Sequence, residues 1–373
     1  MRILIVTADY KLGFGGIASF IQGIAESMTI AGHQVFVLAP RLPNLNDDCL
    51  PYRVIRYKRL RRFSNLWSSI ITLYLNLAFK YDIVLYGHAS STLSIGGIIA
   101  RKFNLNRLAV LTHGNDLDYT VSNNIDKYLL NKLIRTTDLI LANSSFTKNK
   151  VINKYQDISK KVKILNPGVW PNTLSKIKGK AKVVKKNRMT ILTVGRLVPK
   201  KGIDDLITAF ATVIKKHPKI NLKIIGQGPE RVKLDLLVKK LNVSNNILFV
   251  GAKHKNEIYD EMMQCDLFIL PSKNVDGDVE TFGIVYLEAG ACGKAVIGTR
   301  QGGVPDAIAE GISGVLVEPG NITQLTNEMI KLIENKKMRI KMGINGKKRV
   351  EEEFTWYKIA KVLEDHLKSI KCL

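Results

Sequence analysis

Cysteine is scarce in this sequence, and its copies lie far apart. There are four, with no C-x-x-C pair among them: Cys49, Cys265, Cys292 and Cys372. Such scattered cysteines are typical of reduced thiols in a cytoplasmic protein and lack the spacing of metal ligands. No apolar stretch without polar breaks reaches the roughly 18 residues of a membrane-spanning helix. The apolar run at Met1–Thr7 is too short for a signal peptide and is typical of a buried strand. We therefore expect a cytoplasmic protein.

Acidic residues are also under-represented. The chain has 32 Asp+Glu against 57 Lys+Arg, a net charge of +25. Such a charge attracts polyanions, namely nucleic acid, an anionic membrane surface or a phosphorylated substrate. Aromatic residues make up only 7% and do not interleave with the basic runs, whereas nucleic-acid binding needs stacking platforms or a groove-reading helix. We therefore expect no nucleic-acid partner, and a basic nucleic-acid-binding protein is kept as the alternative of a different class.

The segment Arg53–Arg62 carries six basic side chains and no acid. Apolar and aromatic residues follow it: Phe63, Leu66, Trp67, Ile70, Ile71, Leu73, Tyr74 and Leu77. This is the composition of a segment that lies on a bilayer, which predicts an anionic membrane surface as a partner and a peripheral position on the inner face of the plasma membrane. A second interpretation is that the apolar face packs in the domain and the arginines are solvated. The sequence leaves both open.

The length of 373 residues and the apolar fraction of 46% fit two domains of ordinary size. Strand and helix patterns alternate in both halves, which predicts parallel βαβ units. The expected strands are 3–7, 34–39, 83–86, 108–112, 138–142, 190–194, 222–225, 247–250, 267–270, 295–298 and 314–317. We expect two doubly wound, Rossmann-like α/β domains at 1–170 and 189–353, joined by a lysine-rich linker at 171–188. An amphipathic helix at 354–373 is expected to pack back on the N-terminal domain.

In each half, a glycine-containing loop follows the first strand. Ligands of doubly wound domains bind outside the carboxyl ends of the strands, so two facing domains would form an interdomain cleft lined by such loops. Gly13–Gly16 is not the G-x-G-x-x-G fingerprint and has no acid placed to hold a ribose, which disfavours a dehydrogenase. Gly195–Gly202 contains Arg196 and Lys201, and this pair of cations can hold a diphosphate and neutralise it as it leaves.

Two glutamates flank an apolar segment that starts at a glycine. If a helix begins at Phe282 or Gly283, Glu280 lies in the loop before it and Glu288 lies between one and two turns inside. The free N–H groups of a helix start suit a phosphate, and carboxylates accept hydrogen bonds from sugar hydroxyls. A nucleotide-sugar has both parts. Two glutamates at this spacing also occur in helices without a ligand, so the pattern gains its meaning from the basic loop before it.

The basic loop, the glycine-started helix and the two glutamates, in this order, resemble the retaining glycosyltransferases of family 4, whose two-domain fold is called GT-B. The resemblance covers essentially the whole chain. Further motifs follow the same order: Gly15-Gly16, Thr112-His113-Gly114, Asn143-Ser144-Ser145, Asn166-Pro167-Gly168-Val169, Gly226-Gln227-Gly228-Pro229 and Pro271-Ser272.

The resemblance implies a role for each matching residue. Arg196 and Lys201, with Gly195 beside them, would hold the donor diphosphate, and Glu288 the ribose hydroxyls. Glu280 would take hydroxyls of the transferred sugar, beside the backbone N–H groups of Phe282, Gly283 and Ile284. Gly16 would let the N-terminal loop approach the donor phosphates, and His113 would lie near the sugar being transferred. A histidine at a strand end also commonly only bonds backbone, which is the other interpretation of His113.

The resemblance also implies a reaction without cofactor or metal. Asp276–Asp278 and Asp116–Asp118 have the D-x-D form with which one-domain glycosyltransferases bind a divalent ion. Here Arg196 and Lys201 already neutralise the diphosphate, so we expect no metal. We expect the acids around Asp276 to shape the loop before Glu280, and Asp116 or Asp118 to contact the acceptor.

The segment Val275–Glu280 is similar to that of mannosyltransferases acting on phosphatidylinositol mannosides and on lipid-linked polysaccharide precursors. With Arg53–Arg62, this favours a hexosyltransferase that uses GDP-mannose or a UDP-hexose and a lipid-linked glycan or glycolipid acceptor in cell-envelope polysaccharide synthesis. A soluble acceptor is the alternative. A sugar-nucleotide epimerase or phosphorylase of the same fold would share the cleft but not this set of basic and acidic residues.

Overall fold

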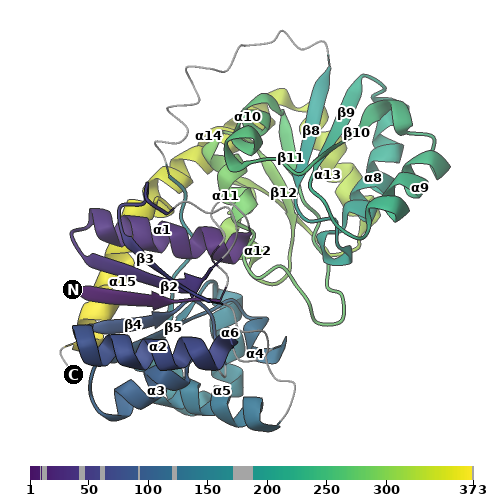
Figure 1. Ribbon diagram of the computed structural model, residues 1–373. Coiled ribbons are helices and arrows are strands. Elements are labelled where there is room, and N and C mark those ends of the chain that lie inside the picture. The colour runs from purple at the N-terminus through teal and green to yellow at the C-terminus, as the bar shows by residue number, and fades with distance from the viewer. Residues whose placement is uncertain are drawn as a thin grey trace. The chain divides into compact units, whose positions relative to one another are not determined.

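The computed structural model describes residues 1–8, 10, 15–41, 47–58, 64–90, 93–119, 124–170 and 188–371. The chain forms two compact units (Figure 1). The N-terminal unit contains residues 1–168 and 356–373, and the C-terminal unit contains residues 169–355. Gly13, Phe14, Cys372, residues 59–62 of the basic segment and all but Arg188 of the expected linker lie outside the described residues.

The N-terminal unit is built on a seven-stranded parallel sheet of order β3-β2-β1-β4-β5-β6-β7. The strands are β1 (Arg2–Val6), β2 (Gln34–Pro40), β3 (Arg53–Tyr57), β4 (Ile83–Tyr86), β5 (Arg107–Thr112), β6 (Leu139–Ala142) and β7 (Val162–Ile164). The helices are α1 (Gly16–Ile30), α2 (Ser64–Phe79), α3 (Ile95–Lys102), α4 (Asp116–Tyr119), α5 (Asn124–Thr136), α6 (Ser145–Lys154) and α15 (Trp356–Lys371). Figure 1 shows α2, α3 and α5 on one face of this sheet and α1 and α15 on the other.

The C-terminal unit has a six-stranded parallel sheet of order β10-β9-β8-β11-β12-β13. Its strands are β8 (Met189–Val194), β9 (Ile220–Ile225), β10 (Ile247–Gly251), β11 (Leu267–Ile269), β12 (Val296–Thr299) and β13 (Gly314–Val317). Its helices are α8 (Ile203–Lys216), α9 (Arg231–Lys240), α10 (Lys255–Gln264), α11 (Ile284–Ala291), α12 (Val304–Ala307), α13 (Ile322–Glu334) and α14 (Lys336–Glu353).

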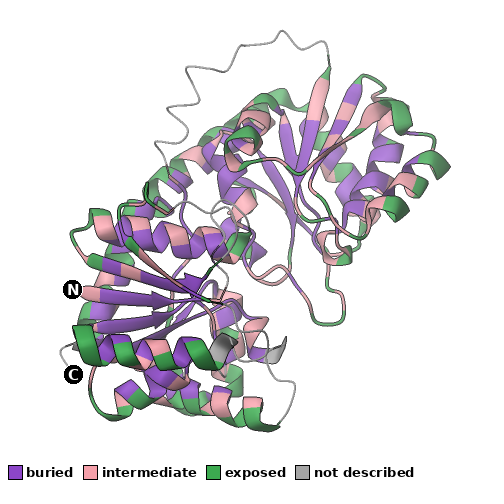
Figure 2. Ribbon diagram, viewed as in Figure 1, coloured by how far each residue is buried: buried purple, intermediate pink, exposed green. Residues whose placement is uncertain are grey.

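The strands are recognisable in the sequence because helices cover both faces of each sheet, so that central strands are mostly apolar. Figure 2 shows the inner strands of both sheets as buried. All residues of β4 and β6 are buried, as are Ile3–Val6 of β1. The predicted fold class, two doubly wound parallel-sheet domains, is confirmed, and the predicted strands agree with the observed ones within two residues.

Two strands and the nature of the basic segment differ from the sequence prediction. Arg53–Tyr57 forms the edge strand β3, paired in parallel with β2, and does not lie flat as an interfacial segment. Arg56 is not a solvated cation, because it donates to both carboxylate oxygens of Asp47 at 2.8 Å and to the Pro40 carbonyl at 3.0 Å. This half of the segment is part of the domain, as the second interpretation expected, but Arg56 is paired and not solvated. The short strand β7 was not predicted either.

Helix α15 closes the N-terminal unit through Trp356. This side chain is buried, and a Cβ built on Gly23 of α1 would lie 2.0 Å from its Cζ2 atom. The Trp356 ring also packs near the ring of Phe20, with the centroids 5.8 Å apart. Trp356 therefore has a packing role. Val169 belongs to the C-terminal unit, where its amide donates to the Phe354 carbonyl at 2.8 Å.

The strand order places a binding edge in each unit. In the C-terminal sheet, β8 pairs with β9 on one side and with β11 on the other, so the chain order reverses beside β8. In the N-terminal sheet the same reversal occurs beside β1, between β2 and β4. Ligands of doubly wound sheets bind outside the carboxyl ends of strands at such a reversal. A ligand is therefore expected at the loops after β8 and β11.

Candidate active site

The basic loop after β8 has a rigid backbone. Leu197 is completely buried; its amide donates to the Gln227 carbonyl at 2.9 Å, and its carbonyl accepts from the Glu230 amide at 3.0 Å. Neighbouring glycines allow this approach, because a Cβ on Gly228 would lie 2.3 Å from the Leu197 carbonyl oxygen. With Leu197 buried as an anchor, the adjacent Arg196 side chain is exposed, and it makes no hydrogen bond or ion pair with any residue that the structure describes.

The next two cations of this loop are paired with the loop that precedes α11. Lys200 donates to Asp278 at 2.7 Å, and Lys201 forms an ion pair with Glu280. The Lys273 amide donates to the Lys200 carbonyl at 2.8 Å, which joins the two loops through the backbone as well. Opposite charges thus hold the basic and acidic loops together across the ends of β8 and β11. The sequence prediction included Lys201 and Glu280 but missed the pair of Lys200 with Asp278.

Lys273 adds a further link between the same loops. Its Nζ atom lies 2.7 Å from a carboxylate oxygen of Asp204 and 3.2 Å from one of Asp205, both in the first turn of α8. Burial raises the pKa of the Asp205 carboxyl, with a further contribution from the neighbouring Asp204 charge, and Lys273 opposes this rise. Of the cations on these two loops, Lys200, Lys201 and Lys273 are therefore neutralised by carboxylates, and the charge of Arg196 is available for an anion.

Helix α11 begins at Ile284, one or two residues later than the sequence suggested, and Gly283 is its N-cap. Gly283 has a φ of 80°, and a Cβ there would lie 2.5 Å from a ring carbon of Tyr286. Only glycine fits this corner without displacing the buried Tyr286, whose hydroxyl donates to the Leu270 carbonyl at 2.6 Å. The corner places Glu280 just before the free N–H groups of the helix start, as expected from the sequence.

Gly302 and Gly303, which were not among the predicted site residues, pack against the backbone of Glu280. The Gly303 amide donates to the Glu280 carbonyl at 3.0 Å, and a Cβ on Gly302 would lie 2.1 Å from that carbonyl oxygen. Gly302 also has a φ of 54°. The role of this pair could have been predicted, because Gly302-Gly303 follows β12 at the carboxyl edge of the sheet, where the other site loops lie.

Glu288 lies in the second turn of α11 and is 8% exposed. The Tyr259 hydroxyl donates to Glu288 Oε1 at 3.3 Å, and Lys255 Nζ lies 3.6 Å from the same atom. Burial raises the pKa of the Glu288 carboxyl, while Lys255 and Tyr259 act in the opposite direction. A buried, ionised carboxylate disfavours folding at neutral pH, and this cost disappears as the pH falls and the group takes up its proton. Such a costly group is typical of a functional site. Lys255 and Tyr259 were missed because nothing in their local sequence marks them.

The predicted residues of the N-terminal unit lie at the corresponding edge of its own sheet. Gly16 is the first residue of α1 after the N-cap Gly15, and a Cβ at either position would meet no atom within 4 Å. His113 follows β5; its Nε2 atom lies 2.9 Å from the Gly87 carbonyl oxygen after β4 and therefore donates to it. This is the backbone contact that the second interpretation of His113 proposed. Its predicted role near the sugar stays a prediction.

The two D-x-D sequences have structural partners. Asp278 is paired with Lys200, and Asp276 occupies a left-handed backbone position with φ of 51° in the tight turn before Glu280. Asp116 accepts from the Ala89 amide at 2.9 Å and from the Thr112 hydroxyl at 2.8 Å. The side chain of Asp118 is outside the described residues. Within the described part of the chain, no three His, Cys, Asp or Glu side chains come together in a way that could hold a metal ion.

Two family models match the two halves of this chain. The model described as "Glycosyltransferase Family 4" matches residues 14–172, and the model described as "Glycosyl transferases group 1" matches residues 175–349. The chain belongs to the family 4 glycosyltransferases. The second model contains both paired loops, α11 and Glu288, and the first contains Gly16 and His113. The resemblance inferred from the sequence motifs is thereby confirmed.

Several curated proteins are similar to this glycosyltransferase over most of their length. The GDP-mannose-dependent alpha-(1-6)-phosphatidylinositol monomannoside mannosyltransferase of Mycolicibacterium smegmatis is 25% identical over 368 residues, which cover 95% of each chain. A GDP-mannose-dependent mannosyltransferase of Corynebacterium glutamicum, which acts on the monoacylated monomannoside, is 26% identical over 379 residues. The N-acetyl-alpha-D-glucosaminyl L-malate synthase of Bacillus anthracis is 26% identical over 287 residues, 75% of this chain and 73% of that protein.

Solved structures share the fold at lower identity. Anabaena Alr3699/HepE in complex with UDP has a TM-score of 0.80 at 21% identity, covering 99% of this chain and 100% of that one. WaaG, a glycosyltransferase involved in lipopolysaccharide biosynthesis, has a TM-score of 0.72 at 19% identity, covering 97% and 99%. These likenesses identify the GT-B fold.

Proposed function

We propose that the protein is a retaining hexosyltransferase that moves a mannose- or glucose-type hexose from GDP-mannose or a UDP-hexose to a hydroxyl of a lipid-linked glycan or glycolipid. The observation that carries this proposal is an arginine without an ion pair to any described residue, next to a lysine–glutamate pair, at the chain reversal of the C-terminal sheet. Arg196 would bind the donor diphosphate, Lys201 would turn from Glu280 to the same group, and Glu280 would then accept the hydroxyls of the sugar. Glu288 would accept those of the ribose.

The chemistry follows from the charge that the reaction creates. Breaking the bond between the anomeric carbon and the phosphate leaves positive charge on the sugar and negative charge on the diphosphate. Cations already fixed beside that oxygen stabilise the transition state without reorganising. The departing phosphate can accept the proton of an acceptor hydroxyl that attacks from the same face, which retains the anomeric configuration. This route needs no side-chain nucleophile, and Gly16 and His113 keep the roles that the resemblance implies.

The donor site is tested by calorimetry with UDP, GDP and ADP, using wild type and Glu288→Gln. We expect one of UDP or GDP to bind, and the variant to bind it about 10–100-fold more weakly, because hydrogen bonds to a charged acceptor contribute about 1.5–3 kcal/mol. The unfolding midpoint of the variant at neutral pH should equal or exceed that of wild type, since the variant lacks the buried charge, and this difference should disappear in acid.

A matched control for this measurement is Glu310→Gln, which removes an exposed carboxylate that is paired with Arg300. It should leave nucleotide affinity unchanged. The donor assignment would be given up if no nucleotide bound to wild type, or if both variants bound like wild type. Hydrolysis of the matching GDP- or UDP-sugars then identifies the hexose.

The acceptor and the location of the protein form the finer part of the proposal. The mannosyltransferase relatives, which act on phosphatidylinositol mannosides by name, support a lipid-linked acceptor and a peripheral position at the cytoplasmic face of the membrane. The N-acetyl-alpha-D-glucosaminyl L-malate synthase relative supports a soluble acceptor as the second candidate. Among the described residues, no helix has the length and apolar character that crossing a membrane requires. Product analysis with glycolipid and soluble acceptors separates the two candidates.

We expect the transfer reaction to be independent of divalent metal. Arg196 and Lys201 supply the positive charge that a metal would otherwise bring to the diphosphate. Asp278, the second acid of the nearer D-x-D sequence, is held by Lys200. Transfer rates measured before and after EDTA treatment should therefore agree. Loss of activity with EDTA and its return with manganese would contradict this expectation.

A further inference from the structure

Helix α2 of the N-terminal unit exposes its apolar residues. Leu66 is 45% exposed, Trp67 40%, Ile70 53%, Tyr74 66% and Leu77 59%. Spacings of three and four residues place these side chains along one side of the helix, and we call them the α2 stripe. Helix α2 carries no charged residue along its sixteen positions.

The opposite side of α2 packs on the rest of the unit mainly through small polar residues, together with Leu75 and the partly buried Ile71. The side chains of Ser68, Ser69, Thr72 and Asn76 are at most 2% exposed. Thr72 donates to the Ser68 carbonyl at 2.8 Å, and Ser69 donates to the Leu93 carbonyl at 2.9 Å. These small side chains allow α3 to come close, because a Cβ on Gly96 would lie 2.0 Å from the Ser69 carbonyl oxygen. Small polar side chains thus fill much of the buried side of α2 while large apolar ones are exposed, whereas an ordinary surface helix turns its apolar side to the core.

The neighbouring helices of the same layer extend the apolar surface. Phe103, at the end of α3, is 68% exposed, and Ile99 of α3 is 36% exposed. On α5, Ile125 and Tyr128 are 69% and 62% exposed. Figure 1 shows α2, α3 and α5 side by side on one face of the sheet. Large exposed apolar patches of this kind mark interaction surfaces in proteins that otherwise expose apolar residues singly.

Basic residues gather where α2 and α3 end. Lys80 follows α2 directly and Lys102 is the last residue of α3; both are exposed, and neither makes an ion pair with another described residue. Lys80 borders a hollow of about 370 Å³ that Asp82, Arg101, Asn104 and Arg107 also line.

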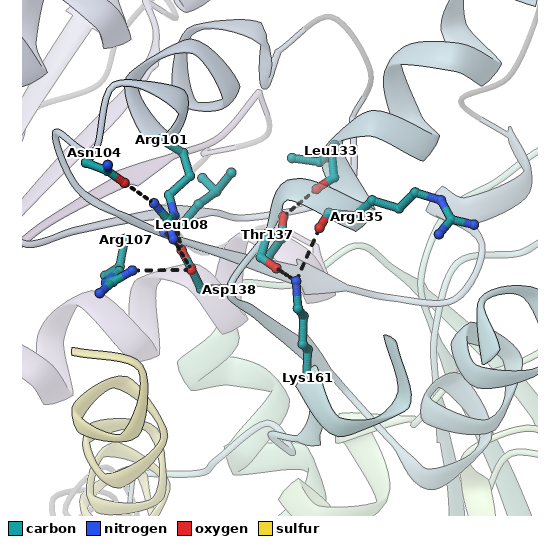
Figure 3. A network of polar contacts seen from close by, with 9 residues as sticks. All are labelled: Arg101, Asn104, Arg107, Leu108, Leu133, Arg135, Thr137, Asp138 and Lys161. Carbon is teal, nitrogen blue, oxygen red and sulfur yellow. Dashed lines mark hydrogen bonds and ion pairs between the residues drawn. The ribbon is translucent and has the colours of Figure 1, made fainter. Parts of the chain in front are cut away.

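Asp138 contacts both arginines of this hollow and offsets one of their two positive charges. Arg101 donates to its two carboxylate oxygens at 2.7 and 2.8 Å, and Arg107 lies 3.8 Å from one of them (Figure 3). The charges of Lys80 and Lys102 are not balanced in this way. The apolar surface therefore has an unneutralised positive end.

We propose that the α2 stripe, together with Lys80 and Lys102, docks the protein on an anionic lipid bilayer. The inference deepens the proposed function and rests on it, because a transferase with a lipid-linked acceptor has to work at the bilayer. Apolar and aromatic side chains enter the interface between head groups and acyl chains, while lysines bind anionic head groups. A second copy of the chain is a poorer occupant, because a contact between two α2 helices would bring no carboxylate to the lysines, since α2 carries no charged residue.

The test is flotation of the full-length protein with vesicles of phosphatidylcholine alone or mixed with phosphatidylglycerol. Wild type should bind the mixed vesicles. The double variant Ile70→Ser/Leu77→Ser should lower the partition coefficient about 100-fold, since burying each side chain contributes on the order of tenfold. Lys80→Gln/Lys102→Gln should lower it about tenfold on the mixed vesicles only. The control Val232→Ser/Leu236→Ser removes two residues of α9 that are 70% and 61% exposed, and it should bind like wild type.

Three results would overturn the docking proposal. The first is that wild type does not float with the mixed vesicles, and the second is that the stripe variant binds as well as the α9 control. The third is that sedimentation without lipid shows a dimer for wild type and a monomer for the stripe variant. Calorimetry on the stripe variant keeps this test separate from the transferase proposal. Its nucleotide affinity should equal that of wild type, whereas absence of nucleotide binding in every variant would defeat the transferase assignment and leave the vesicle result standing.

Discussion

Replacing Arg196 by methionine is expected to lower kcat for sugar transfer by about 10²–10³, the usual cost of removing one fixed donor to a developing oxyanion. The structure indicates that this substitution disturbs no ion pair between described residues. Arg196 is exposed and forms no ion pair with any described residue, so its removal leaves no carboxylate without a partner. Lys201 is a less suitable target, because its loss would also leave Glu280 unpaired. Steady-state kinetics with the donor identified by calorimetry measures the effect.

Arg188 provides the matched control for this variant. It lies just before β8, at the amino end of the strand that Arg196 follows at the carboxyl end, and it is also exposed. Arg188→Met removes the same charge from the same strand and should leave kcat within about twofold of wild type, as is usual for surface substitutions. Unfolding midpoints should agree among all three proteins. Equal kcat values for the two variants would show that Arg196 does not act on the leaving diphosphate.

The sequence predicted where the site loops lie better than it predicted which charged residues of these loops form ion pairs. A buried parallel strand is mostly apolar, so the end of β8 and the start of the next helix can be located from composition, and Arg196 with them. The sequence cannot show which cations are already neutralised. Lys200, Lys201 and Lys273 pair with acids far along the chain, at Asp278, Glu280 and the first turn of α8. Only the folded structure shows that Arg196 makes no ion pair with a described residue while these lysines do.

The segment from Arg53 to Leu77 shows a second limit of prediction from sequence. The sequence left its basic start between a bilayer surface and the domain, and it is the edge strand β3, where one partner strand suffices and Arg53 can face solvent. The periodicity of α2 does reveal an apolar side and a polar side. It does not reveal which side faces the core, because small hydroxyl side chains can be buried when they bond to the backbone of their own helix. The exposure of the α2 stripe became evident only from the exposed fractions of its residues.

Gly202→Ala is expected to lower the free energy of unfolding of the C-terminal unit by about 3–5 kcal/mol. Gly202 joins the basic loop to α8 with a φ of 62°, and a Cβ there would lie 1.9 Å from the Pro271 carbonyl oxygen. Alanine must therefore adopt a left-handed conformation and also displace backbone. Moving Pro271 shifts Lys273, whose amide bonds to the Lys200 carbonyl, so the two charged loops would separate. Urea denaturation measures the loss, and activity well below the midpoint should fall too.

Gly293→Ala distinguishes the clash from the backbone conformation. Gly293 follows α11 with a φ of 71°, but a Cβ there would meet no atom within 4 Å. This variant should lose only the cost of one left-handed alanine, about 1–2 kcal/mol, and should keep its activity. The difference between the two variants then measures how tightly the loops after β8 and β11 are packed. If Gly202→Ala cost no more than Gly293→Ala, the loops would be free to move apart, and Arg196 would not be held ready for the diphosphate.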